Sequence, residues 1–164
     1  MRVSPIGFAF NDLGKVLEAS KKSAEVTHNH PEGIKGAQAI ASAVFLARTG
    51  NSKEEIRDFI TNSFGYNLMR TVEEIRPHYK FDISCQGSVP EAIICFLDSS
   101  DFEDCIRLSI SIGGDSDTIA CMAGGIAQAY YQTMPSEIVN TAREKLPTEM
   151  ITVLDEFEGI YGIS

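Results

Sequence analysis

Two carboxylates and a hydroxyl lie within four residues of this chain, as Asp115, Asp117 and Thr118 of the sequence GGDSDT. Carboxylate and hydroxyl oxygens are hard ligands, the kind that Mg²⁺, Mn²⁺ and Ca²⁺ prefer. The leading glycine pair allows positive φ angles or a close approach to a ligand. This segment, Gly113–Thr118, is called the acidic motif below. Its residues predict either a metal site or an aspartate that caps a helix, and they do not by themselves choose between the two.

Two familiar aspartate motifs can be tested against the acidic motif. An EF-hand loop that began at Asp115 would need oxygen ligands at its fifth and twelfth positions and a glycine at its sixth. Those positions hold Ile119, Ile126 and Ala120, so the EF-hand interpretation fails. A haloacid-dehalogenase-type phosphohydrolase would place its Asp-x-Asp after a buried strand, and no βαβ alternation surrounds the motif here. A phosphohydrolase that uses Asp115 and Asp117 is therefore the weaker alternative.

The elements that must position these residues all carry helix signals. Capping residues, prolines and glycines predict helix starts at Asp12, Pro31, Ser52, Thr71, Ser88, Asp101, the acidic motif, Pro135 and Pro147. Only residues 108–112 alternate like a strand, and that run is too short and isolated to build a sheet. The pattern predicts a single all-α domain over residues 1–164, a compact multi-helix orthogonal bundle of seven to nine helices.

Composition limits the classes of partner. A net charge of −9 argues against nucleic acid as a partner, because such binding depends on Lys and Arg neutralising phosphates. Neither a membrane-spanning run nor a signal peptide is recognisable, so a cytoplasmic location is the default expectation. The cysteines lack the spacing of a structural zinc site. Cys95, Cys105 and Cys121 lie among apolar residues and are expected to be small buried side chains.

Several separated segments resemble one family in the order that the family has them. These segments are Met1–Gly7, Thr27–Gly33 with Gly36-Ala37, Ser88–Ala92, the acidic motif with the Ala123–Gly125 stretch that follows it, and Met134-Pro135. Together they resemble the ADP-ribosylglycohydrolases, which include the dinitrogenase-reductase activating glycohydrolase. The resemblance covers nearly the whole chain.

The resemblance implies an all-α hydrolase that uses two Mg²⁺ or Mn²⁺ ions to release ADP-ribose from an acceptor such as an Arg or Ser side chain. It implies metal and catalytic roles for Asp115 and Asp117, a metal-binding hydroxyl on Thr118, and substrate contacts from His28, Gly114 and Ser116. A histidine at a helix end can also simply bond a local carbonyl, which is the alternative for His28. A metal pair of His28 with His30 lacks a third ligand at motif spacing.

The chain also departs from the family pattern. Complete members are about twice as long, and their N-terminal half carries a Gly-Asp motif, a Thr-Asp-Asp metal half-site and glycine-rich loops that are not found here. A half-site of two carboxylates should bind Mg²⁺ poorly, because the ion keeps most of its water. Uncovered apolar faces would favour association with a complementary N-terminal chain or a second copy.

Three hypotheses follow from the sequence. The first is the C-terminal half of an ADP-ribosylglycohydrolase that needs a complementary chain for activity on ADP-ribosylated proteins. The second is a truncated, non-catalytic relative that serves as a binding or homodimeric helical domain. The third is the phosphohydrolase described above.

Overall fold

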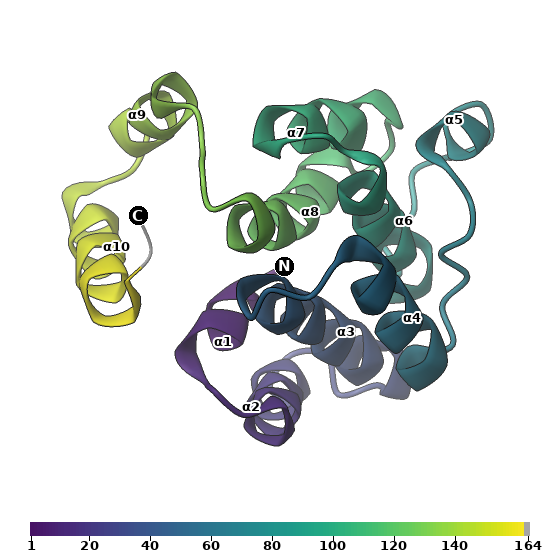
Figure 1. The fold of residues 1–164 in the computed structure, drawn as a ribbon, viewed down its shortest axis with the longest axis horizontal. Coiled ribbons are helices and arrows are strands. Elements are labelled where there is room, and N and C mark those ends of the chain that lie inside the picture. The colour runs from purple at the N-terminus through teal and green to yellow at the C-terminus, as the bar shows by residue number, and fades with distance from the viewer. Residues whose placement is uncertain (163–164) are drawn as a thin grey trace.

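The computed structural model describes residues 1–162, and every regular element among them is a helix. Figure 1 labels these helices, whose bounds are α1 Ser4–Ala9, α2 Leu13–Glu25, α3 Pro31–Arg48, α4 Lys53–Phe64, α5 Val72–Ile75, α6 Cys85–Asp98, α7 Phe102–Ser111, α8 Ser116–Tyr131, α9 Ser136–Glu144 and α10 Thr148–Tyr161. The all-α prediction is confirmed. The expected seven to nine helices are too few, because the described residues form ten.

Local capping sets most helix ends where the sequence predicts them. At α4, the Ser52 hydroxyl accepts from the Glu55 N–H (3.2 Å), and the Glu55 carboxylate accepts from the Ser52 N–H (2.7 Å). Thr71 and Glu74 form the same capping box at α5. Each box satisfies two backbone donors that the helix itself leaves without partners. Gly65 ends α4 at a φ of +69°, a conformation that glycine adopts without steric cost.

The start of α6 differs from the prediction. Ser84, rather than Ser88, caps the helix, because its hydroxyl accepts from the Gly87 N–H at 3.1 Å. Ser88 and Pro90 therefore lie inside the helix, and the Ser88 hydroxyl donates to the Ser84 carbonyl at 2.7 Å. The earlier start adds a turn beneath the fully buried stretch 88–97, and this burial outweighs the hydrogen bond that Pro90 cannot donate.

The short helix α1 was not predicted. Pro5 lies in its first turn, where the missing N–H costs no hydrogen bond. Gly7 lies so close to α3 that a Cβ there would be 2.6 Å from Val44 Cβ. At the C-terminal end of α3, the Arg48 guanidinium donates to the carbonyls of Gly7 (3.2 Å) and Phe10 (2.7 Å). Contacts with α3, which no local pattern reveals, therefore stabilise α1.

Helix α3 is central to the packing. It contacts α1, α2, α4, α6 and α8, while α8 also packs against α6 and α7 (Figure 1). The largest fully buried side chains come from these helices and the segments between them: Val16, Ile40, Val44, Ile56, Ile60, Leu68, Val72, Ile93, Ile94, Phe96, Ile119 and Ile126. One apolar cluster thus holds together the elements that lead into the acidic motif.

A partly buried lysine joins α4 to α6 and α8. The Lys53 ammonium donates to the Leu97 carbonyl at 3.1 Å and lies over three aromatic rings. Its distances to the ring centroids are 5.2 Å for Phe96, 5.4 Å for Tyr131 and 5.8 Å for Tyr130. Cation–π attraction strengthens when the cation is withdrawn from water, so this contact holds the far end of α8.

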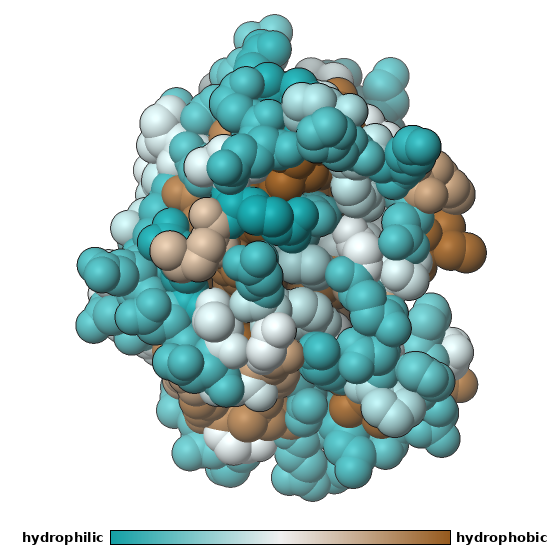
Figure 2. Space-filling model, turned by 90° about the vertical axis from the view of Figure 1, so that its right-hand side faces the viewer, coloured by the Kyte–Doolittle hydropathy of each residue, from teal (hydrophilic) through white to brown (hydrophobic). Residues whose placement is uncertain are grey.

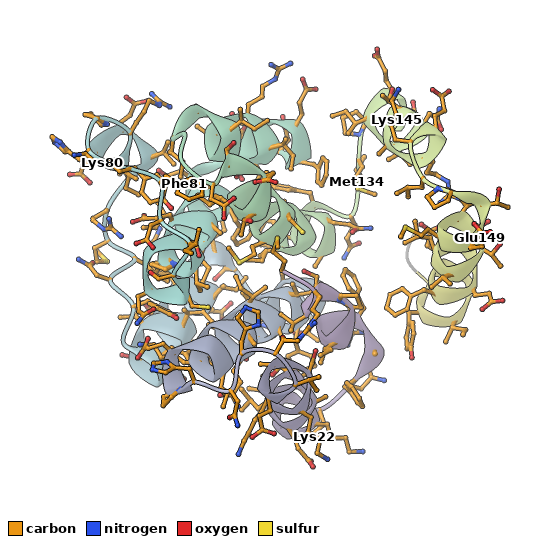
Figure 3. All side chains as sticks on the ribbon, turned by 180° about the vertical axis from the view of Figure 1, so that it is seen from behind. Lys22, Lys80, Phe81, Met134, Lys145 and Glu149 are labelled. Carbon is orange, nitrogen blue, oxygen red and sulfur yellow. The ribbon has the colours of Figure 1, made fainter. Side chains whose placement is uncertain are left out.

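Helices α9 and α10 form an arm that touches the central cluster through Phe157 of α10. Figures 1 and 3 show them to one side of the other helices, joined to α8 through a segment that contains Met134 and carrying Lys145 between them. Neither helix contains a buried residue. Arg143 of α9 pairs with Asp155 and, at 3.5 Å, with Glu158 of α10. The single-domain expectation for residues 1–164 stays a prediction, and residues 163–164 lie outside the described residues.

The cysteines follow the prediction with one exception. Cys95 and Cys105 are buried, and burial raises the pKa of each thiol to about 12. Cys121 is exposed, so the expectation of burial was wrong for it. Ile119 of α8 faces the core, and two residues further along a helix the side chain points about 200° away. All four thiols are free in the part of the chain that the structure describes.

The outer surface is mainly hydrophilic on the face that Figure 2 shows, where apolar groups are scattered rather than continuous. Among residues 1–162, no helix is both long and apolar enough to cross a bilayer.

Candidate active site

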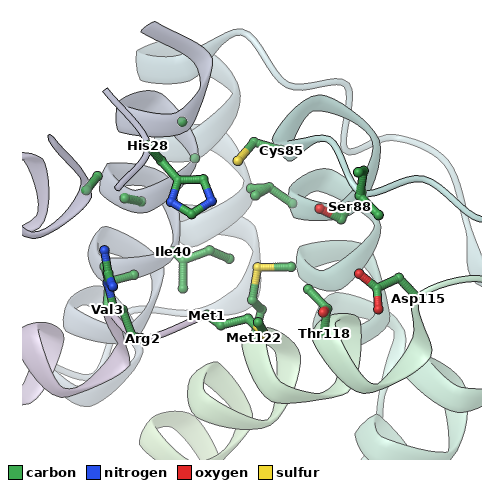
Figure 4. A pocket seen from close by; sticks show the side chains of 16 residues that line it. Met1, Arg2, Val3, His28, Ile40, Cys85, Ser88, Asp115, Thr118 and Met122 are labelled. Atoms are coloured by element: carbon green, nitrogen blue, oxygen red, sulfur yellow. The ribbon is translucent and has the colours of Figure 1, made fainter. Parts of the chain in front are cut away.

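A cavity of about 300 Å³ lies where the chain start, the α2–α3 connection, α3, α6 and α8 meet. Figure 4 shows it with His28 on one side and Asp115 and Thr118 on the other. Cys85 and Ser88 of α6 and Met122 of α8 also line it. Elements distant in sequence therefore bring three of the predicted site residues to one cavity.

The other predicted residues do not line this cavity. Gly114, Ser116 and Asp117 belong to the same turn and helix start, but they are absent from its wall. Asp117 is exposed, and its carboxylate accepts from the Thr118 N–H at 2.9 Å. The pKa of Asp117 lies below its ordinary value, first because of the neighbouring Asp115 side chain and then because of that N–H. Asp117 is therefore an anion at neutral pH.

The helix-cap explanation does not account for Asp115. This residue occupies the N-cap position of α8, yet its side chain makes no capping hydrogen bond. Its carboxylate instead faces the cavity beside the Thr118 hydroxyl (Figure 4). A cap is worth about 1 kcal/mol only when the side-chain oxygen accepts a backbone N–H. The orientation of Asp115 leaves its oxygens available for a ligand.

The strand-based phosphohydrolase pattern also lacks structural support. Asp115 follows helix α7 and a two-glycine turn, and no strand precedes it anywhere in the described part of the chain.

The Tyr79 ring packs against the turn of the acidic motif, a contact that was not predicted from the sequence. Gly113 and Gly114 have φ angles of +73° and +66°. A Cβ on Gly114 would lie only 2.5 Å from the Tyr79 ring, whereas nothing lies within 4 Å of one on Gly113. Burial, followed by the nearby carboxylates of Glu91, Asp82 and Asp115, raises the pKa of Tyr79 to about 12. The ring is a neutral surface against which the turn packs.

Glu91 is a second residue with an unexpected environment. Glu91 lies within α6, and only 6% of it is exposed. One carboxylate oxygen accepts from Arg70 at 2.9 Å, and the other has no hydrogen-bond partner among the described residues. Burial raises the pKa of Glu91, and Arg70 opposes this effect only in part. A buried acid next to a neutralising arginine was not recognisable from local sequence.

This environment predicts a pH-dependent stability that Glu91→Gln removes. Because the folded state raises the pKa of Glu91 above 4.5, the folded protein holds this proton more tightly than the unfolded chain does. The contribution of Glu91 is present at low pH and is lost as the pH rises through the raised pKa. We expect urea unfolding to show that, between pH 5 and pH 7, the parent loses more stability, or gains less, than Glu91→Gln does. Equal changes in the parent and the variant would contradict the assignment.

The donors of the acidic motif fit a hard cation in kind, but they are too few to enclose one. Asp115, Asp117 and Thr118 offer two carboxylates and a hydroxyl, all from one helix start. Among the described residues, no group of three or more His, Cys, Asp or Glu side chains could hold a metal ion. Mg²⁺ is often bound through only one or two protein carboxylates together with substrate oxygens and water. The motif is therefore suited to be one side of a shared metal site.

Comparison with known proteins decides the family. The ADP-ribosylglycohydrolase family model matches residues 1–160. The chain belongs to the ADP-ribosylglycohydrolase family. The resemblance predicted from the separate motifs is thereby confirmed, and so is the all-α fold that it implied.

Individual members of the ADP-ribosylglycohydrolase family agree with this assignment. The human ADP-ribosylhydrolase ARH3 is 30% identical, over 80% of this chain and 48% of ARH3. The ADP-ribosylarginine hydrolase Tri1 of Pseudomonas putida is 30% identical, over 85% of this chain and 40% of Tri1. A solved ADP-ribosylglycohydrolase-related protein complex superposes with a TM-score of 0.61 and 25% identity, over 77% of this chain and 46% of that one. The chain spans about half the length of the curated relatives it matches.

Proposed function

We propose that this chain forms one wall of an active site that hydrolyses the bond between ADP-ribose and an acceptor. The observation that carries the proposal is the meeting of His28 with Asp115 and Thr118 at one cavity. Family membership supports ADP-ribose conjugates as the substrate class, because the relatives are named as ADP-ribosylhydrolases. A second wall, formed by a segment outside this chain's described residues, would act together with this one on the bond to the acceptor.

The proposed cation is Mg²⁺ or Mn²⁺, held on this side by Asp115, Asp117 and Thr118. Such an ion, when bound, polarises a ribose hydroxyl and lowers the pKa of its water. The remaining ligands would come from substrate oxygens, water and a segment outside this chain's described residues, on the same or another polypeptide. Asp115 and Asp117 orient the cation, and His28 offers a hydrogen bond to ADP-ribose. Gly114 shapes the turn, and a substrate contact from Ser116 remains a proposal.

Asp115→Asn tests this proposal directly. Titration calorimetry with ADP-ribose should show binding in Mn²⁺ that falls strongly when the metal is chelated. Removing the Asp115 charge should weaken that metal-dependent binding by more than about tenfold, since an interaction with a charged group is worth about 1.5–3 kcal/mol and about 1.4 kcal/mol is tenfold in affinity. Asp58→Asn removes the same charge at an exposed position of α4 and should leave binding unchanged.

Two results would contradict the proposal. One is the absence of any metal-dependent ADP-ribose binding by the parent chain. The other is equal binding by Asp115→Asn and Asp58→Asn. Hydrolysis of a phosphate monoester that is lost in Asp115→Asn would instead support the phosphohydrolase alternative.

A further inference from the structure

A chain of hydrogen bonds leads from Arg2 to His28. The Arg2 guanidinium donates to the Ser23 carbonyl at 3.0 Å and to the Thr27 hydroxyl. The Thr27 hydroxyl oxygen in turn lies 2.8 Å from His28 Nδ1. Arg2 and His28 both line the cavity described above, across from Asp115 (Figure 4). Hydrogen bonds through Thr27 thus connect two residues of the cavity wall, although Thr27 itself does not line the cavity.

The direction of these bonds follows from which groups can donate. A guanidinium has donors only, so the Thr27 oxygen must accept from Arg2. The Thr27 hydroxyl still has its own proton to donate, and His28 Nδ1, at 2.8 Å, can accept it when Nδ1 itself carries no proton. A neutral imidazole that accepts at Nδ1 carries its proton on Nε2. If Nδ1 carried the proton instead, the Thr27 oxygen would accept twice and its own proton would have no partner among the described residues.

We propose that Thr27, itself held by Arg2, positions His28 as a hydrogen-bond donor through Nε2 to an oxygen of the bound ligand. Figure 4 shows the ring edge opposite Arg2 facing across the cavity toward Ser88. The fitting ligand group is an oxygen acceptor such as a diphosphate, because Arg2 adds a positive charge on the same wall. Thr27 and Arg2 are thus positioning residues. The identity of the ligand rests on the proposed function, whereas the tautomer of His28 does not.

The two other histidines of the chain supply internal references. His30 caps α3, and its Nδ1 accepts from the Glu32 N–H at 3.2 Å, so a backbone donor holds His30 with its proton on Nε2. His78 makes no side-chain hydrogen bond to any residue that the structure describes, so its tautomers exchange freely. His28 should resemble His30 if Thr27 acts as proposed, and should resemble His78 if it does not.

Nitrogen-15 NMR of the imidazoles measures the tautomer without any ligand. At about pH 8, where an ordinary histidine is neutral, the nitrogen shifts of His28 should match those of His30. In Thr27→Val, which keeps the shape but lacks the hydroxyl, they should move toward those of His78. Asn29→Ala, on the other side of His28, should cause no such change. A proton on His28 Nδ1, or shifts that are the same in Thr27→Val and the parent, would overturn the proposal.

A titration then connects the tautomer to binding. Thr27→Val and Arg2→Met should each weaken ADP-ribose binding by about threefold to tenfold, the effect of one net hydrogen bond. Inorganic pyrophosphate should shift the His28 Nε2 signal if the diphosphate is the acceptor, and ADP-ribose alone should shift it if a ribose oxygen is. If the Thr27→Val substitution changes the His28 nitrogen shifts as expected while the parent binds no ADP-ribose, that outcome would contradict the proposed function and support the role of Thr27. ADP-ribose affinity that is equal in Thr27→Val and the parent would overturn that role.

Discussion

Gly114→Ala should strongly weaken metal-dependent ligand binding, whereas Gly113→Ala should retain it. Both glycines have positive φ angles, which cost an alanine about 1–2 kcal/mol at either position. Only at Gly114 would the new methyl group also meet the Tyr79 ring, at 2.5 Å. Overpacking of this kind costs about a further 1–3 kcal/mol, or else the turn moves and carries Asp115 with it. The two glycines are therefore a matched pair that separates backbone strain from packing.

The measurements are the free energy of unfolding in urea and the affinity for ADP-ribose in Mn²⁺. In a Tyr79→Ala background, the additional cost of Gly114→Ala should shrink, because the group it meets is gone. Equal effects of the two alanine substitutions would show that Tyr79 does not support the acidic motif. The unfolding measurement decides this point even if the chain binds no ligand.

Phe96→Ala should lower the free energy of unfolding by about 3–5 kcal/mol, the range for a fully buried phenylalanine. Phe96 has no exposed surface, and its ring lies edge-on to Tyr130 at 5.3 Å and to Tyr131 at 6.5 Å. The substitution would also remove one of the rings beneath the Lys53 ammonium. This loss is a large fraction of the free energy of unfolding of a typical protein, which is about 5–15 kcal/mol.

Phe81→Ala is the control for this effect. Phe81 is 70% exposed and lies in the segment between α5 and α6. Its removal should change the free energy of unfolding by less than about 0.5 kcal/mol, as is usual for surface positions. Similar losses for Phe81→Ala and Phe96→Ala in urea unfolding would contradict the assignment of Phe96 to the core.

The helix ends that were predicted correctly depend on interactions within a few residues. Ser52 with Glu55 and Thr71 with Glu74 satisfy donors that lie three residues away, so their effect can be recognised in the sequence. The same reasoning failed at Ser88, where burial of α6 and the competing cap at Ser84 decided the helix start. Local capping predicts a helix end well unless the packing of the helix favours a different one.

The acidic motif was likewise recognisable because its oxygen donors are adjacent in the chain. What sequence reasoning could not determine was whether Asp115 caps α8 or faces a ligand, since that depends on the cavity it meets. The buried environments of Tyr79 and Glu91 were missed for the same reason. The adjacent glycines were the one local signal, because glycine allows a positive φ or a close approach, and the structure shows the close approach only at Gly114.

The sequence by itself determined the helical class, most of the helix boundaries and the oxygen donors of the acidic motif, because these depend on short-range periodicity and capping. Family membership was also recognisable from motifs and their order. Only the tertiary structure decided that His28 faces the same cavity as Asp115, that Thr27 bonds to Nδ1 of His28, and that Tyr79 packs against Gly114. The meeting of His28 with Asp115 and the contact of Tyr79 with Gly114 join side chains from distant helices and connections, and those positions depend on how the whole core packs.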